Sequence, residues 1–197
     1  MLEKYSPNLI LASASPRRVD LLYQIGIVPD QVIPAYIDET PLNGELPRQL
    51  VARLSAGKAI SVSKENSGSF ILAADTVVAC GKRILSKAET PEQARTFLEL
   101  LSGRRHKVIG GLAIISPAGK IYKRIVETHV TFKRLSLKDL DLYLASGEWE
   151  DKAGAYAIQG LAARFVRAIN GSYSNVVGLP LFETSQLLEG IGFNRGV

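Results

Sequence analysis

Several residue types are scarce in this chain of 197 residues, and each scarcity excludes a class of protein. The single cysteine, Cys80, has no partner for an internal disulfide, which favours a reducing compartment. The two histidines, His106 and His129, have no further ligand at metal-binding spacing, so we expect structural or surface roles for both. No apolar run reaches the roughly 20 residues that cross a bilayer, and no export signal opens the chain. We therefore expect a cytoplasmic protein that does not bind membranes.

The basic residues are dispersed rather than clustered. The formal net charge is +5, yet no run of Lys and Arg exceeds two residues apart from the stretch Arg104-Arg-His-Lys107. Aromatic residues make up only 7% of the chain and do not alternate with basic residues, as a platform for single-stranded nucleic acid requires. These features favour a small anionic ligand over a nucleic acid.

Strand-like and helix-like stretches alternate along the chain. With 46% hydrophobic and 22% charged residues, the composition is that of an ordinary globular protein. No repeat, low-complexity tract or linker interrupts it, so we expect one domain over residues 1–197 with a mixed α/β sheet and flanking helices. We expect strands at 9–12, 31–36, 70–80, 83–85, 107–115, 120–133 and 164–169, and helices at 16–25, 47–64, 90–101, 137–146 and from 180. Residues 151–160 read as a loop with a short strand, and 170–178 as a turn-rich connector.

The stretch from Leu9 to Arg18 has the features of a phosphate site. A buried strand is followed by Pro16, which suits the first position of a helix that Ser15 can N-cap. The N-terminus of that helix favours an anion, and Ser13, Arg17 and Arg18 supply further donors. An equally open alternative is that Ser15 and Pro16 only cap the helix and that the arginines are solvated.

Asp75 interrupts an otherwise apolar strand. Because a buried carboxylate is costly without partners, Asp75 must meet a metal, a cation or several hydrogen-bond donors. A backbone solution at a bulge or strand end remains open. Two neighbouring acids, Asp38 and Glu39, follow a predicted strand and are either solvated or directed at a metal.

Three further polar residues have a chemical and an ordinary interpretation. Lys58 lies in a predicted helix and Lys87 in a loop beside a hairpin, where lysines are usually solvated. Gln159 ends a glycine-rich loop, where an amide either closes a turn or reads a base edge through paired donor and acceptor groups. Taken together, all these residues fit a nucleoside triphosphate site, with cations for the phosphates, carboxylates for a divalent cation and water, and an amide for the base.

The same residues resemble the Maf family of nucleoside triphosphate pyrophosphatases, the septum-formation-inhibitor-like proteins. The similarity spans almost the whole chain, from Leu9 to about Leu188. It rests on Ser13-Ala-Ser-Pro-Arg-Arg18, Asp38-Glu39, Lys58-Ala59, Ala74-Asp-Thr-Val-Val78, Ser102-Gly103 with His106, Asp151-Lys-Ala-Gly-Ala-Tyr-Ala-Ile-Gln-Gly160, and Asn170-Gly-Ser-Tyr with Asn175-Val-Val-Gly-Leu-Pro180.

The resemblance implies hydrolysis of the α–β phosphoanhydride, a divalent cation such as Mg²⁺ or Mn²⁺, an elongated two-lobed fold like that of inosine triphosphate pyrophosphatase, and frequently a homodimer. It assigns catalysis to Asp75 and Glu39, which together with Asp38 form the expected metal ligands. The residues that match phosphate contacts are Ser13, Arg17, Arg18, Lys58 and Lys87.

Three positions match the branch of the family that acts on dTTP and UTP, namely Arg17, Thr76 and Gln159. The sequence departs from the family at Ala88, where a proline usually follows the lysine, and this leaves the position of Lys87 less fixed. We therefore expect a house-cleaning pyrophosphatase for these nucleotides. The alternative is a nucleotide-binding regulator of septum formation that acts through a cell-division partner and needs no turnover.

Overall fold

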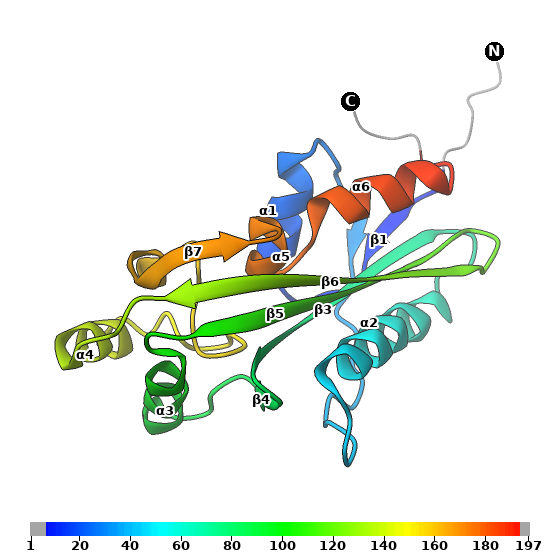
Figure 1. Ribbon diagram of the computed structural model, residues 1–197. Helices are drawn as coiled ribbons and strands as arrows, with labels where there is room; N and C mark the ends of the chain where they lie inside the picture. The colour runs from blue at the N-terminus through cyan, green and yellow to red at the C-terminus, as the bar shows by residue number, and fades with distance from the viewer. Residues whose placement is uncertain (1–6, 194–197) are drawn as a thin grey trace. The chain divides into compact units, whose positions relative to one another are not determined.

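A mixed β-sheet with flanking helices is the framework of the computed structural model, which describes residues 7–193 (Figure 1). The sheet has seven strands in the order β2-β1-β3-β5-β6-β7, and β4 pairs with β3 off this path. Strand β1 pairs in parallel with both β2 and β3, whereas the β3–β4 and β6–β7 pairs are antiparallel. The strands are β1 (Leu9–Leu11), β2 (Gln31–Val32), β3 (Phe70–Cys80), β4 (Arg83–Leu85), β5 (Arg105–Ile115), β6 (Ile121–Phe132) and β7 (Val166–Asn170).

Proline and hydroxyl residues set the starts of several helices. Pro16, Pro47 and Pro91 each open a helix, where the missing N–H costs no hydrogen bond. Thr90 and Ser136 cap helices with their side-chain oxygens. The helices are α1 (Pro16–Gln24), α2 (Pro47–Ser63), α3 (Pro91–Leu101), α4 (Leu137–Ala145), the 3₁₀ turn η1 (Leu161–Phe165), α5 (Tyr173–Val177) and α6 (Leu181–Gly190).

The chain forms two compact units, and β3, β5 and β6 each contribute residues to both. Among the described residues, the first unit comprises 7–75, 110–125 and 178–193, and the second comprises 76–109 and 126–177. In the first unit, α2 covers one face of the strands, while α1 and α6 lie on the other (Figure 1). Successive side chains of a strand point to opposite faces of the sheet, and both faces here carry apolar side chains. On the face covered by α2, Ile10, Ile71 and Ala113 pack with Ala59 of that helix.

Helix α2 lies unusually close to β5. A Cβ built on Gly111 of β5 would stand 2.3 Å from the carbonyl oxygen of Val51 and 3.0 Å from Oγ of Ser55, both in α2. Only glycine fits at that distance, so Gly111 sets how closely the helix packs on the sheet. This packing matters for the site because α2 also carries Lys58.

Aromatic side chains dominate the core of the second unit. The ring of Phe132 makes edge contacts with His106, Tyr156 and Phe165, and Phe165 in turn contacts Tyr143. His106 is 1% exposed and its Nε2 lies 2.9 Å from the Tyr156 hydroxyl, which confirms the structural role expected for it.

Most of the predicted elements are confirmed, and the differences fall in the connecting segments. The strand expected at 31–36 covers only residues 31 and 32, and the loop at 151–160 contains one isolated bridge instead of a short strand. The connector at 170–178 includes the helix α5, and Nδ2 of Asn175 in that helix donates to Oγ1 of Thr128 at 3.1 Å. Local patterning misses these cases because tertiary hydrogen bonds decide them.

Candidate functional site

A lysine between two carboxylates forms the centre of the candidate site in the first unit. Helix α2 presents Lys58, whose Nζ lies 2.6 Å from Oδ1 of Asp75 and 2.8 Å from Oε1 of Glu39. The side chains of Lys58 and Asp75 are 10% and 9% exposed, whereas that of Glu39 is 50% exposed. The unusual carboxylate in β3 therefore has a cation as its partner, and Glu39 reaches the same cation from the solvent side.

The electrostatic environment of Asp75 contains opposing influences. Burial raises the pKa of Asp75, while the nearby charges of Lys58 and Arg18 lower it and that of Glu39 raises it. The short hydrogen bond from Lys58 favours the ionised carboxylate. Asp75 is thus a dehydrated carboxylate whose charge depends on the cations around it.

The loop before α1 is organised by the hydroxyl of Ser13. Its Oγ accepts hydrogen bonds from the backbone N–H of Ser15 at 3.1 Å and from Nη1 of Arg18 at 3.0 Å. A hydroxyl has two acceptor lone pairs and one donor, so both lone pairs of Ser13 are occupied and its O–H remains a donor. Ser15 stands at the N-cap position but makes no side-chain capping bond, so the capping expected of its hydroxyl is wrong.

A second hydrogen bond that holds this loop joins it to Gly178, which is distant in the sequence. Nε of Arg18 donates to the carbonyl oxygen of Gly178 at 2.9 Å, across 160 residues of sequence. The sequence gives no signal for this contact, although Gly178 lies in one of the motifs that carry the resemblance. With Arg17 half-buried next to it at the start of α1, the loop joins two arginines, a hydroxyl donor and a helix N-terminus.

The two carboxylates on Lys58 fit a divalent cation, and Asp38 does not join them. Mg²⁺ in proteins is held by one or two carboxylates together with water and substrate phosphates, and Asp75 and Glu39 lie around one point of positive charge. Asp38 is exposed, and its Oδ1 accepts from the backbone N–H of Thr40 at 2.9 Å. Within residues 7–193, no group of three or more Asp, Glu, His or Cys side chains converges as a complete metal site.

The remaining predicted residues belong to the second unit. Thr76 follows Asp75 directly in β3 and is half-buried, whereas Lys87 and Gln159 are exposed. The backbone of Lys87 forms an antiparallel bridge with Ala153, so the loop is held although alanine replaces the usual proline at 88. Ala88 itself is 7% exposed and belongs to the apolar core of this unit.

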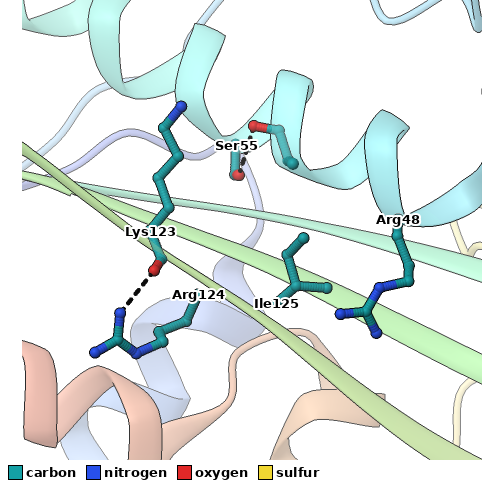
Figure 2. Close-up of a pocket in the computed structure, with 6 residues that line it drawn as sticks. Arg48, Ser55, Lys123, Arg124 and Ile125 are labelled. Carbon is teal, nitrogen blue, oxygen red and sulfur yellow. Dashed lines mark hydrogen bonds between the residues drawn. The ribbon is translucent and has the colours of Figure 1, made fainter.

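A surface hollow beside α2 contains none of the predicted site residues. Figure 2 shows Arg48 and Ser55 from α2 on one side and Lys123, Arg124 and Ile125 from β6 on the other. The basic side chains point in different directions, and Nη1 of Arg124 turns back to the carbonyl oxygen of Lys123 at 3.0 Å. The hollow is therefore not a convergent anion site.

Within the described part of the chain, no helix combines the length and the apolar character needed to cross a bilayer. The fold is similar to that of a solved HAM1 protein from Coxiella burnetii, with a TM-score of 0.51 and 16% sequence identity. That likeness covers 93% of this chain and 99% of the other, and it supports the expected fold class.

Sequence similarity to known proteins extends over nearly the whole chain. A protein named dTTP/UTP pyrophosphatase from Paramagnetospirillum magneticum is 64% identical over 94% of this chain and 97% of its own length. A protein of the same name from Rhodospirillum rubrum is 57% identical over 97% of this chain and 91% of its own length. The profile of the Maf-like protein family matches residues 8–191, and the chain therefore belongs to that family.

Proposed function

We propose that this protein hydrolyses dTTP and UTP to the nucleoside monophosphate and pyrophosphate. Relatives that are 64% and 57% identical over nearly their whole length carry the name dTTP/UTP pyrophosphatase. The structural observation that carries the proposal is the buried Lys58–Asp75 pair with Glu39 on the same ammonium. Such a pair places a buried carboxylate among cations, and cations at that place can stabilise the negative charge of a polyphosphate.

The phosphates would be bound by the cationic loop and the lysines. Ser13 offers its free O–H, and Arg17 and Arg18 offer guanidinium groups at the N-terminus of α1. Lys58 has three ammonium protons, of which the two carboxylates use two, so one remains for a phosphate oxygen. Lys87, on its bridged loop, adds a further cation.

Asp75 would orient and deprotonate the attacking water. The water oxygen bonds to the α-phosphorus, the bond to the bridging oxygen breaks, and pyrophosphate leaves with the bonding electrons. The hydrogen bond from Lys58 favours the ionised form of Asp75, which can accept a hydrogen bond from water. Asp75 and Glu39 would hold a divalent cation, Mg²⁺ or Mn²⁺, which would neutralise part of the phosphate charge.

In this proposal, Arg17, Thr76 and Gln159 would select the base. Uracil and thymine present a carbonyl acceptor next to an N–H donor, and a primary amide carries the complementary pair. Cytosine reverses both groups on that edge, so an amide fixed in one orientation distinguishes the two bases. Gln159 has the required amide and is exposed in the second unit.

A nucleotide panel with product identification tests this function. Purified protein with Mg²⁺ or Mn²⁺ is incubated with UTP, dTTP, CTP, ATP and GTP, and pyrophosphate and orthophosphate are measured separately. We expect pyrophosphate and the monophosphate, fastest from UTP and dTTP, and no turnover after the divalent cation is chelated. Release of orthophosphate, or no turnover of any nucleotide, would contradict the proposal.

A further inference from the structure

Gln159 occupies the third position of a tight turn whose first and last residues are joined by a backbone hydrogen bond. The N–H of Gly160 donates to the carbonyl oxygen of Ala157 at 3.0 Å, which defines a four-residue turn over 157–160. The side chain of Gln159 is exposed, while Ala157 and Ile158 before it are buried. The position of the amide therefore depends on how the two ends of this turn are held.

The first end is held by a buried tyrosine. The hydroxyl oxygen of Tyr143 in α4 accepts a hydrogen bond from the N–H of Ala157 at 3.0 Å. Tyr143 is 1% exposed and its ring packs against Phe165 with the centroids 5.3 Å apart. A buried N–H must have a partner, and here a side chain supplies it where a β-ladder normally would.

The second end is held by a carboxylate from the loop after α4. Oε2 of Glu148 accepts from the N–H of Leu161 at 2.7 Å. A Cβ built on Gly160, the last residue of the turn, would stand 2.1 Å from that oxygen, so glycine at this position lets the carboxylate reach the N–H of Leu161. The backbone is thus held two residues before and two residues after Gln159 by a single short stretch, residues 143–148.

The chain leading into the turn is fixed as well. The Tyr156 hydroxyl lies 2.9 Å from Nε2 of His106, and Ala155 adopts a left-handed backbone with φ of +57°. The N–H of Gly154 donates to the carbonyl oxygens of Leu85 and Ser86 at 3.0 and 3.1 Å, next to the bridge that holds Lys87. Local sequence propensity does not explain why this segment is held, since its partners are His106 and residues 85–87, which are distant in sequence.

We infer that Tyr143 and Glu148 are positioning residues for base discrimination, because they hold the turn that presents the Gln159 amide. The inference rests on the proposed function, in which that amide distinguishes uracil from cytosine. The amide itself can rotate about its side-chain bonds, so the backbone does not set which way round it stands. The held turn sets the distance from which the amide reaches the base, and a loosened turn weakens the paired hydrogen bonds on which the discrimination depends. Tyr143 and Glu148 act through the turn and are not themselves catalytic residues.

The test compares two substitutions of Glu148, one that keeps the hydrogen bond and one that removes it together with the rest of the side chain. Glu148→Ala removes the acceptor for the N–H of Leu161, whereas Glu148→Gln retains a carbonyl oxygen in the same place. We expect Glu148→Ala to lower the UTP to CTP ratio of kcat/KM about tenfold, the size that one hydrogen-bonded group contributes. The loss should lie in a higher KM for UTP with kcat nearly unchanged, and Glu148→Gln should restore the ratio.

Tyr143→Phe provides a second, independent variant. It deletes the oxygen that accepts from Ala157 and keeps the ring that packs on Phe165. We expect the same fall in the UTP to CTP ratio. Thermal unfolding of each variant checks that the fold persists, and a general loss of structure would lower kcat for both nucleotides equally instead of changing their ratio.

Gln159→Ala separates failure of this inference from failure of the proposed function. If the wild type shows no preference for UTP over CTP, or if Gln159→Ala leaves the preference intact, base reading by Gln159 is wrong and the inference falls with it. If Gln159→Ala abolishes the preference while Glu148→Ala and Tyr143→Phe preserve it, only the positioning role is overturned. Support requires that Glu148→Ala cause no further loss of preference in the Gln159→Ala background.

Discussion

The ammonium of Lys58 lies 2.6 Å from the carboxylate of Asp75, and each side chain keeps only about a tenth of its surface exposed. An unpaired carboxylate at that depth in a central strand would lose its hydration without compensation. The ion pair explains how β3 accommodates Asp75, and it ties the helix that supplies the cation to the strand that supplies the acid. Changes to either partner therefore have different expected consequences for turnover and for stability.

Asp75→Asn is expected to abolish most of the turnover while preserving the fold. The asparagine oxygen still accepts a hydrogen bond from Lys58, but a neutral amide neither accepts a proton from water nor attracts a divalent cation. We expect kcat for UTP to fall by about 100-fold or more, the usual contribution of a general base. Pyrophosphate release measures this, and calorimetric titration with UTP measures the binding that remains.

Asp141→Asn is the matched control for that substitution. Asp141 is an exposed aspartate of α4 whose carboxylate pairs with Arg95, and no site residue contacts it. We expect wild-type turnover from this variant. Wild-type turnover from Asp75→Asn would contradict the catalytic role. Conversely, a dead Asp75→Asn enzyme that still arrests cell division would favour the regulator that acts without turnover.

Lys58→Met is expected to lower stability and to make stability depend on divalent cations. Methionine fills similar space but leaves the buried Asp75 without its cation, which typically costs about 3–5 kcal/mol. If Asp75 and Glu39 hold Mg²⁺ or Mn²⁺, the added cation replaces the missing ammonium charge and restores part of the loss. Thermal unfolding with and without the divalent cation measures this, and we expect a larger gain for Lys58→Met than for the wild type. Equal gains would argue against a metal at these carboxylates.

Most strands and helices, and the unusual burial of Asp75, could be predicted from the sequence because the apolar and polar residues follow clear local patterns there. The continuous apolar run of β3 predicts a buried strand, and the cost of burying Asp75 predicts that it has a partner. The partner was not predictable, since Lys58 lies 17 residues away in a helix where lysines are usually solvated. Its burial follows from how closely α2 packs on the sheet, which is a tertiary property.

The residues that hold functional loops were the hardest to predict. The carbonyl oxygen of Gly178 and the side chains of Tyr143 and Glu148 act through contacts with distant segments. Helix α5 was missed, and the strand expected at 31–36 is confirmed only at residues 31 and 32, because tertiary hydrogen bonds and not propensity set the limits of both elements. Sequence patterns identify residues with unusual chemistry but give little information on the residues that support them.

Gly111→Ala is expected to destabilise the protein and to impair the site together. The new methyl group would stand 2.3 Å from the carbonyl oxygen of Val51, so α2 must move away from β5, which costs about 1–3 kcal/mol for overpacking. Because α2 carries Lys58, kcat/KM for UTP should also fall. Gly190→Ala is the matched control, since a Cβ at that position of α6 meets no atom within 4 Å. Urea unfolding and steady-state kinetics distinguish the two, and equal stability of both variants would refute the close packing.

His106 is expected to make the fold sensitive to mild acid. Burial lowers the pKa of His106 to about 4, whereas an unfolded chain titrates near 6.5. Between these values the unfolded chain binds a proton on His106 and the folded protein does not, so the free energy of unfolding falls as the pH falls. From pH 7 to pH 5 the loss amounts to about 2 kcal/mol by proton linkage.

His106→Gln isolates this contribution from that of the other titrating groups. Glutamine keeps a polar partner for the Tyr156 hydroxyl but does not titrate, so the carboxylates contribute equally in both proteins and only the imidazole differs. Urea unfolding at pH 7 and pH 5 gives the change in free energy for each protein. We expect His106→Gln to be less stable than the wild type at pH 7, because it loses aromatic contacts with Phe132, but to lose less stability on acidification. An identical loss in the two proteins would mean that the imidazole already binds its proton within the fold above pH 5.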